Sequence, residues 1–320
     1  MEFRIIERTF SQDESLPSFL IANIHPTTDI QDNLNKMEQI IELAHEKGVN
    51  ILIFPELCIS GYIWMTNNNN HVKEHLLNCE NSRLTAWLNN IKDSLKSDGS
   101  GLEYIFYGNA RQVNGDLYNT LFILHNQVDY NREEYLYNKI FVPKEEQRYF
   151  RRGSDKRLTI DTKYGRFGFL ICYDLCFVEL ARRYSFTDDA DAIITISCWR
   201  SEGTREYPEM NIKTDFYYGM LWELMNSSKA AYNQVWSLGA NTVGTHEISG
   251  VHFWGASGLW APSGMQLLKA SSLKEELLII RNLDIQKQKY REQDDFNYRI
   301  DFENVYREMK EPQKDVKLLF

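Results

Sequence analysis

Near the start of this 320-residue chain, two apolar segments flank a stretch with helical spacing. Residues 18–24 (SFLIANI) and 49–54 (VNILIF) are short apolar runs typical of buried strands. The residues between them that keep helical spacing are Asn33, Met37, Ile40, Ile41 and Ala44. A strand–helix–strand unit is the building block of α/β folds, so it limits the architecture more than any other feature.

Further strand-like segments recur along the rest of the chain. They cover residues 104–107, 120–124, 167–171, 190–197, 234–238, 257–261 and 276–282. One more helix is predicted over residues 82–95. Since no Pro/Gly/Ser-rich linker divides these segments, we predict one domain over residues 1–285. Residues 286–320 are charged and poor in apolar residues, which predicts an extension that packs on the domain or on a partner subunit, or a loose tail.

Charge and cysteine usage exclude several classes of protein. The formal net charge of −9 argues against a general nucleic-acid binder, which needs a basic surface. Residues 1–8 lack the apolar stretch of a signal peptide, and no apolar run is long enough to cross a bilayer. The five cysteines are odd in number and scattered, which favours reduced thiols. We therefore expect a cytoplasmic protein without membrane or nucleic-acid partners.

One cysteine stands at the end of a predicted strand. The apolar run of residues 167–171 leads directly to Cys172, which Tyr173 and Asp174 follow. A helix-like segment begins near Phe177. A thiol at a strand–helix junction projects from a rigid element near free backbone N–H groups, so Cys172 is a candidate nucleophile. The alternative is an ordinary buried cysteine, which acts as a small hydrophobe.

Three charged residues are further candidates. Glu56 follows the predicted strand of residues 49–54, where partial burial would raise its pKa toward the range of a general base. Lys139 is flanked by Tyr137 and Phe141, and it either reaches solvent or supplies a fixed charge inside a site. Glu146, taken alone, is an ordinary surface charge.

Taken together, these segments resemble the nitrilase superfamily of carbon–nitrogen hydrolases. The segments that carry the resemblance are Phe54-Pro55-Glu56, Lys139, residues 146–153, Ile171-Cys172-Tyr173-Asp174, Tyr118-Asn119-Thr120, residues 229–233 and residues 240–244. The resemblance covers roughly residues 18–285. It implies a four-layer α-β-β-α sandwich of the α/β class, a homodimer or higher homo-oligomer, and no metal or organic cofactor.

The resemblance also implies a role for each candidate. Cys172 would be the nucleophile and Glu56 the base that takes its proton and later activates water. Lys139, with the backbone N–H that follows the cysteine, would stabilise the oxyanion. Glu146 would hold Lys139 or the substrate amide in place. The residues expected to bind substrate are Tyr62, Tyr173 and Trp199.

The function implied is hydrolysis of a linear amide or carbamoyl C–N bond of a small molecule through a thioester, with release of ammonia or an amine. Tyr173-Asp174 resembles the amidases, whereas Cys176 stands where many relatives have Arg. The alternatives are a nitrile-hydrolysing or acyl-transferring member, and an inactive binding or scaffold homologue. A metal or redox pair of Cys172 and Cys176, or a cysteine–histidine hydrolase that uses His246 or His252, explains less of the sequence.

Overall fold

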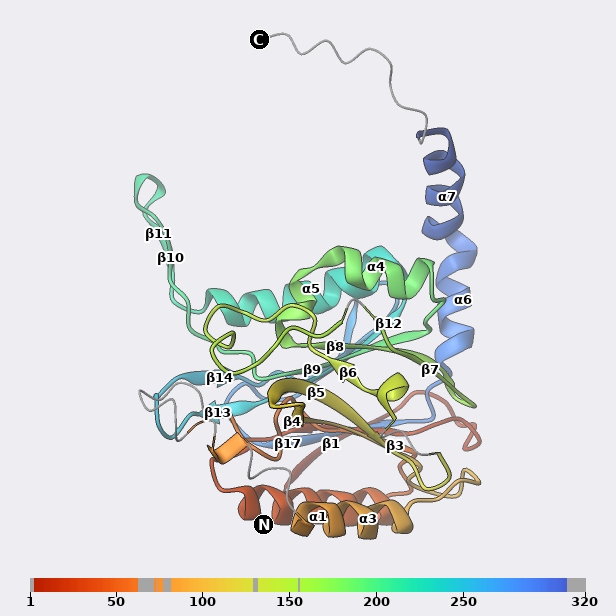
Figure 1. The fold of residues 1–320 in the computed structure, drawn as a ribbon. Coiled ribbons are helices and arrows are strands. Elements are labelled where there is room, and N and C mark those ends of the chain that lie inside the picture. The colour runs from red at the N-terminus through yellow and green to blue at the C-terminus, as the bar shows by residue number, and fades with distance from the viewer. Residues whose placement is uncertain are drawn as a thin grey trace.

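Two β-sheets lie face to face between two layers of helices in the computed structural model (Figure 1). It describes residues 3–62, 72, 74–76, 82–128, 132–154 and 156–309. The strands of the first sheet, in spatial order, are β1 (Arg4–Thr9), β17 (Glu276–Arg281), β2 (Phe19–Asn23), β3 (Ile51–Ile53), β4 (Tyr104–Val113), β5 (Asp116–Leu124) and β6 (Tyr137–Asn138). Those of the second sheet are β16 (Gln266–Lys269), β15 (Gly258–Trp260), β12 (Trp236–Asn241), β9 (Ala192–Ser197), β8 (Gly165–Ile171) and β7 (Thr159–Thr162).

The centre of each sheet is parallel, and strands of the opposite direction flank it. In the first sheet β2, β3 and β4 run parallel, and in the second β8, β9 and β12 do. Two small hairpins stand apart from the sheets: β10 (Arg205–Tyr207) with β11 (Ile212–Thr214), and β13 (Val243–Thr245) with β14 (His252–Trp254). The β10–β11 hairpin projects away from the body of the molecule (Figure 1).

Helices cover the outer face of each sheet (Figure 1). The helices described are α1 (Ile30–Glu46), α3 (Ser82–Ser94), α4 (Val178–Phe186), α5 (Tyr217–Asn233), α6 (Ile285–Asp295) and α7 (Tyr298–Met309). Asp29 caps the N-terminus of α1, because its carboxylate accepts hydrogen bonds from the backbone N–H groups of Gln31 and Asp32. Among the described helices, none is both long and apolar enough to span a bilayer.

Successive side chains along each strand point to opposite faces of the sheet, and this alternation produces the four layers. On β2, Phe19 packs with the second sheet, its ring centroid 6.3 Å from that of Phe167. The next residue, Leu20, belongs instead to the core beneath α1, together with Met37 and Ile41 of that helix. Because successive strand residues point to opposite faces, one apolar strand supplies both cores. The predicted four-layer α-β-β-α sandwich is confirmed.

The ends of the chain add elements that the sequence analysis did not foresee. No strand was predicted before residue 18, yet β1 pairs in parallel with β17. Its exposed charged residues hide the strand pattern. Residues 285–309 form α6 and α7, and Lys289 of α6 donates a hydrogen bond to the carbonyl of Ala190 and pairs with Asp191. The predicted domain boundary at residue 285, with residues 286–320 as an extension that packs on the domain or on a partner subunit, stays a prediction.

Candidate active site

The carboxyl ends of the central parallel strands meet at one edge of the sandwich. Cys172 follows β8 directly and Cys198 follows β9 directly, so both lie at the same edge of the second sheet. In the first sheet, Glu56 lies just beyond β3. The backbone N–H of Cys198 donates to Glu56 Oε2 at 2.7 Å, which joins the two edges. Strand carboxyl ends are the usual place for a site in α/β sheets.

Three of the predicted residues form a buried charge cluster at this edge. Lys139 Nζ donates to Glu56 Oε1 at 3.0 Å and to the two carboxylate oxygens of Glu146 at 3.0 and 2.8 Å. All three side chains are inaccessible to solvent, with exposed fractions of 0–1%. A buried ammonium between two carboxylates is typical of a functional site, because desolvation makes such a cluster costly as a purely structural device.

Backbone packing gives Glu56 its position. The backbone of β4 passes so close to Glu56 that a Cβ on Gly108 would lie 2.8 Å from Glu56 Cα and 2.7 Å from the backbone nitrogen of Leu57. Asn119 Nδ2 on β5 donates to Glu56 Oε1 at 2.6 Å. The carboxylate therefore has donors on both oxygens, which orients it firmly.

The turn at Cys172 is strained. Cys172 has φ +48°, a left-handed conformation that non-glycine residues rarely adopt, and it opens a short 3-10 helix, Cys172–Cys176. Strain of this kind is common where a nucleophile is held on a sharp turn after a strand. The side chain is half-buried, and the Ser197 hydroxyl lies beside its thiol.

Burial and the neighbouring charges determine how these groups titrate. Burial, with the nearby Glu56 carboxylate, holds the pKa of Cys172 well above its ordinary value, although Lys139 opposes the shift. Burial disfavours the Lys139 cation, but Glu146 and Glu56 outweigh burial and keep the pKa of Lys139 well above its usual range. Burial raises the pKa of Glu146 to about 7 against the opposing effect of Lys139. The resting site is therefore a neutral thiol beside a protonated lysine.

The three predicted substrate-binding residues lie in different surroundings. Tyr62 lies near the charge cluster, since burial and then Glu146 raise the pKa of its hydroxyl well above 10. Tyr173 is 39% exposed and follows Cys172 in the chain. Trp199 is buried against Trp222 of α5, and its indole N–H donates to a backbone carbonyl of the same helix. Its side chain faces the helix layer, and substrate binding by these three residues stays a prediction.

Neither a cysteine–histidine hydrolase nor a metal site at Cys172 and Cys176 is supported by this geometry. Among the described residues, the charged groups with the largest effect on the pKa of the Cys172 thiol are Glu56, Lys139 and Glu146, none of which is a histidine. His246 instead hydrogen-bonds Ser249, and His252 approaches Thr245. Within the described residues, no group of three or more His, Cys, Asp and Glu side chains could hold a metal ion.

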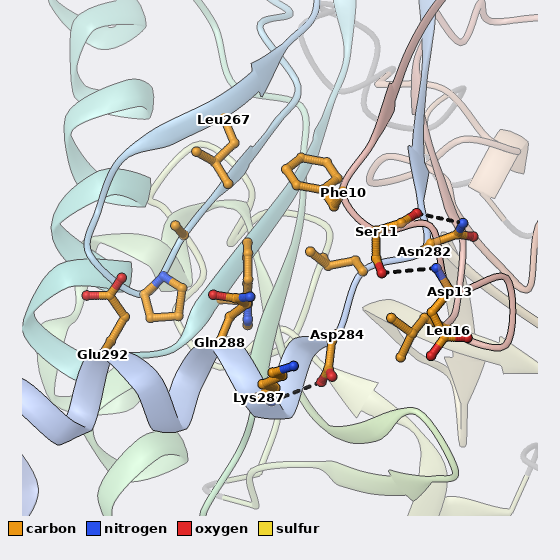
Figure 2. A pocket seen from close by; sticks show the side chains of 14 residues that line it. Phe10, Ser11, Asp13, Leu16, Leu267, Asn282, Asp284, Lys287, Gln288 and Glu292 are labelled. Carbon is orange, nitrogen blue, oxygen red and sulfur yellow. Dashed lines mark hydrogen bonds between the residues drawn. The ribbon is translucent and has the colours of Figure 1, made fainter.

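A separate cavity lies at the other end of the second sheet. It has a volume of about 490 Å³, and Figure 2 shows Phe10, Asp284 and Glu292 among the side chains around it. Trp236, the first residue of β12, also lines it, whereas Cys172 and Cys198 follow the last residues of β8 and β9. Because these strands run parallel, the cavity and the charge cluster lie at opposite strand ends. None of the predicted site residues lines this cavity.

Comparison with known proteins now identifies the family. The sequence profile named carbon-nitrogen hydrolase matches residues 20–291, which is most of the chain. The chain belongs to the carbon-nitrogen hydrolase family. The predicted membership in the nitrilase superfamily is thereby confirmed, and the fold is the one that this family shares.

Curated relatives of this carbon-nitrogen hydrolase match it over most of their length. A probable nitrilase of Schizosaccharomyces pombe is 24% identical over 267 residues, covering 80% of this chain and 84% of the relative. An N-carbamoylputrescine amidase of Solanum lycopersicum is 24% identical over 271 residues, covering 82% and 84%.

Solved structures of the superfamily share the fold of this carbon-nitrogen hydrolase. A branch 10 nitrilase-superfamily protein of Saccharomyces cerevisiae has a TM-score of 0.69 at 22% identity, covering 90% of this chain and 97% of the other. A mutant of the amidase from Nesterenkonia sp. AN1, in which a glutamate is replaced by glutamine, shows covalent addition of the acetamide moiety of fluoroacetamide at the active-site cysteine; it has a TM-score of 0.62 at 17% identity, covering 89% of this chain and 98% of the other.

Sequence reasoning about this hydrolase missed several groups at the site. Asn119 and the backbone N–H of Cys198 hold Glu56, and Ser197 lies beside the thiol. Asp174 had been noted only as a family signature. For Ser197, the last residue of β9, and Cys198, which follows it, one signal was available: they end a buried run at the same strand end as Cys172. Asn119 belongs to the segment Tyr118-Asn119-Thr120 that carries part of the resemblance, but its position inside a strand gives no signal of its contact with Glu56.

Proposed function

We propose that this hydrolase cleaves a linear amide or carbamoyl C–N bond through a thioester on Cys172. The observation that carries the proposal is the buried cluster in which Lys139 contacts both Glu56 and Glu146 beside the half-buried thiol. A base, a fixed cation and a nucleophile within one site are the groups that acyl transfer needs. The covalent adduct described for the Nesterenkonia amidase supports a cysteine route in this fold.

The first half of the reaction forms the thioester. Cys172 Sγ attacks the carbonyl carbon while Glu56 accepts the thiol proton, which compensates for the raised pKa of the thiol. Lys139 Nζ and the backbone N–H of Tyr173 stabilise the oxyanion of the tetrahedral intermediate. The protonated Glu56 then gives its proton to the departing nitrogen, and ammonia or an amine leaves.

The second half hydrolyses the thioester. Glu56, ionised again, takes a proton from water as the water oxygen attacks the thioester carbonyl. The same donors stabilise the second oxyanion, and its collapse expels the Cys172 sulfur, which recovers the proton from Glu56. Glu146 keeps Lys139 in place throughout by its bidentate hydrogen bonds.

Mass spectrometry of the intact protein with a panel of amides, ureas and nitriles tests this proposal. We expect a covalent adduct on Cys172 and release of ammonia or an amine, both lost in Cys172→Ala. Cys176→Ala is the matched control, because Cys176 is also half-buried and lies at the end of the same 3-10 helix. Product release that persists in Cys172→Ala would overturn the mechanism. Turnover of nitriles alone would favour nitrile hydrolysis, and an acyl product with an added amine would favour acyl transfer. No turnover of any compound would favour an inactive binding homologue.

We also propose that the hydrolase forms a homo-oligomer through its α4–α5 layer. Large apolar side chains on these helices are more than half exposed: Val178 (68%), Met220 (58%), Leu224 (60%) and Tyr232 (64%). On the described residues of α1 and α3 no large apolar side chain is exposed to this extent. Several large exposed apolar side chains gathered on one helix layer are typical of a protein–protein interface.

Light scattering after size-exclusion chromatography tests this interface. Leu224→Glu is expected to reduce the molar mass to that of one chain. The control is Leu273→Glu, which lies outside the layer on a side chain that is 71% exposed. A molar mass that Leu224→Glu leaves unchanged would exclude the α4–α5 layer as the interface.

We further propose that the hydrolase works in the cytoplasm. Its described cysteines, Cys58, Cys172, Cys176 and Cys198, are all free, and the mechanism needs a reduced thiol. Subcellular fractionation should recover it with cytoplasmic markers, and recovery in an oxidising compartment would contradict the proposal.

A further inference from the structure

One buried carboxylate connects the two segments that carry the nucleophile and the lysine. Asp174 is fully buried. Its Oδ1 accepts a hydrogen bond from the backbone N–H of Phe141 at 2.8 Å. Its Oδ2 accepts one from the Tyr137 hydroxyl at 2.8 Å and one from the backbone N–H of Ile171 at 3.1 Å.

The positions of these donors are informative. Tyr137 and Phe141 flank Lys139, two residues to each side, at the end of the first sheet. Ile171 is the last residue of β8 and immediately precedes Cys172 in the second sheet. The Asp174 side chain therefore bridges the two sheets at the two points from which the lysine and the thiol project.

The charge on Asp174 strengthens this bridge. Hydrogen bonds to an ionised acceptor are shorter and stronger than those between neutral groups. The bond to the N–H of Ile171 also closes the turn that contains Cys172 at φ +48°, so it stabilises a conformation that is unfavourable by itself. Burial opposes this ionisation and raises the pKa of Asp174 to about 6.

We infer that Asp174 is a positioning residue that sets the distance between Cys172 and Lys139. It touches neither the thiol nor the ammonium in any described contact, and it acts through the backbone on each side of them. The inference rests on the proposed cysteine mechanism. An error of about 1 Å in such a distance is enough to lower the rate about a hundredfold.

The test compares variants that remove parts of the bridge. Asp174→Asn keeps the shape of the side chain but replaces one of its two oxygens with an NH₂ group. That NH₂ group then faces the donors from which the replaced oxygen accepted hydrogen bonds. Tyr137→Phe removes the hydrogen bond to Asp174 Oδ2 and keeps the ring. Asp161→Asn is the control, because Asp161 is an exposed aspartate on β7 whose ion pair within the described part of the chain is with Arg166. Circular dichroism and thermal unfolding establish that each variant is folded.

Two readouts separate positioning from a merely structural role. We expect kcat/KM to fall by about a hundredfold in Asp174→Asn and about tenfold in Tyr137→Phe, mostly through kcat. The pH midpoint for alkylation of Cys172 by iodoacetamide should rise by about half a unit or more in Asp174→Asn, because the thiolate loses the nearby Lys139 charge. Asp161→Asn should change neither quantity.

The outcomes also distinguish the inference from the function on which it rests. Folded variants with an unchanged alkylation midpoint and unchanged kcat would overturn the inference. If Asp174→Asn does not fold, Tyr137→Phe alone decides it by the same two readouts. If the wild-type protein turns over no substrate, the proposed function fails, and the alkylation midpoint still tests whether Asp174 positions the thiol.

Discussion

Lys139 and Glu146 form a bidentate pair in which one ammonium contacts both oxygens of one carboxylate, at 3.0 and 2.8 Å. The third acceptor of the same ammonium is Glu56 Oε1 at 3.0 Å. Since an ammonium has three N–H groups, the resting site already uses all of them. An oxyanion can therefore bind Lys139 only by replacing one of these acceptors, and the bidentate Glu146 is the one that keeps a contact afterwards.

Glu146→Gln is expected to impair both stability and activity. The amide turns a donor toward Lys139 and leaves the buried cation with Glu56 as its only charged partner. Breaking a buried pair in this way costs on the order of 3–5 kcal/mol of unfolding free energy. Urea unfolding and the rate of substrate acylation measure the two effects. Glu145→Gln, next in the chain but exposed, should match the wild type, and equal losses in the two variants would contradict this account.

The stability of the protein should decrease as the pH rises through the titration of Asp174. Burial raises its pKa from 3.8 to about 6 in the folded state, so the folded protein binds this proton more tightly than the unfolded chain does. Protonation of Asp174 therefore contributes roughly 3 kcal/mol to the free energy of unfolding. This contribution is fully present below about pH 4 and is lost as the pH rises through about 6. Asp174→Asn should lack this part of the pH dependence. Urea unfolding of the wild type and of Asp174→Asn between pH 4 and pH 8 checks this prediction. If the unfolding free energies of the two proteins change with pH in the same way, the prediction is wrong.

Gly108→Ala should displace Glu56. The added Cβ would lie within 2.8 Å of backbone atoms of Glu56 and Leu57, and backbone cannot yield as a flexible side chain does. Such overpacking costs about 1–3 kcal/mol, and the shifted carboxylate should lower kcat about a hundredfold. Gly101→Ala is the control, because its nearest neighbour is a lysine side chain at 3.4 Å. Full activity in a folded Gly108→Ala protein would show that the close approach is unimportant.

Lys289→Met should loosen the C-terminal helices. Lys289 is 2% exposed and contacts Asp191 and the carbonyl of Ala190, each at 3.1 Å. Its loss leaves Asp191 buried without its lysine partner, at a cost of about 3–5 kcal/mol. Differential scanning calorimetry and limited proteolysis after residue 285 measure the effect. The control is Lys287→Met, on the exposed side of α6, which should leave thermal stability and proteolysis unchanged. A Lys289→Met protein that matches this control would show that Lys289 does not hold α6 on the domain.

Much of the fold could be predicted because its signals are local. The helical spacing before Ala44 and the apolar runs around Ile53 and Ile171 are properties of neighbouring residues, and the structure has α1, β3 and β8 there. The strand β1 could not be found in this way. It is an edge strand whose exposed residues include Arg4 and Glu7, so its conformation comes from pairing with β17 rather than from its own pattern.

The sequence by itself determined the fold class and indicated the candidate site residues, because a strand that ends in Cys172, a strand followed by Glu56, and Lys139 between apolar neighbours are visible in short stretches that together resemble one superfamily. Only the tertiary structure decided which groups hold them. Asn119 reaches Glu56 across 63 residues and the N–H of Cys198 across 142, while Asp174 joins segments from two sheets. A contact of this kind depends on which strand ends meet in space, and no pattern of neighbouring residues encodes that.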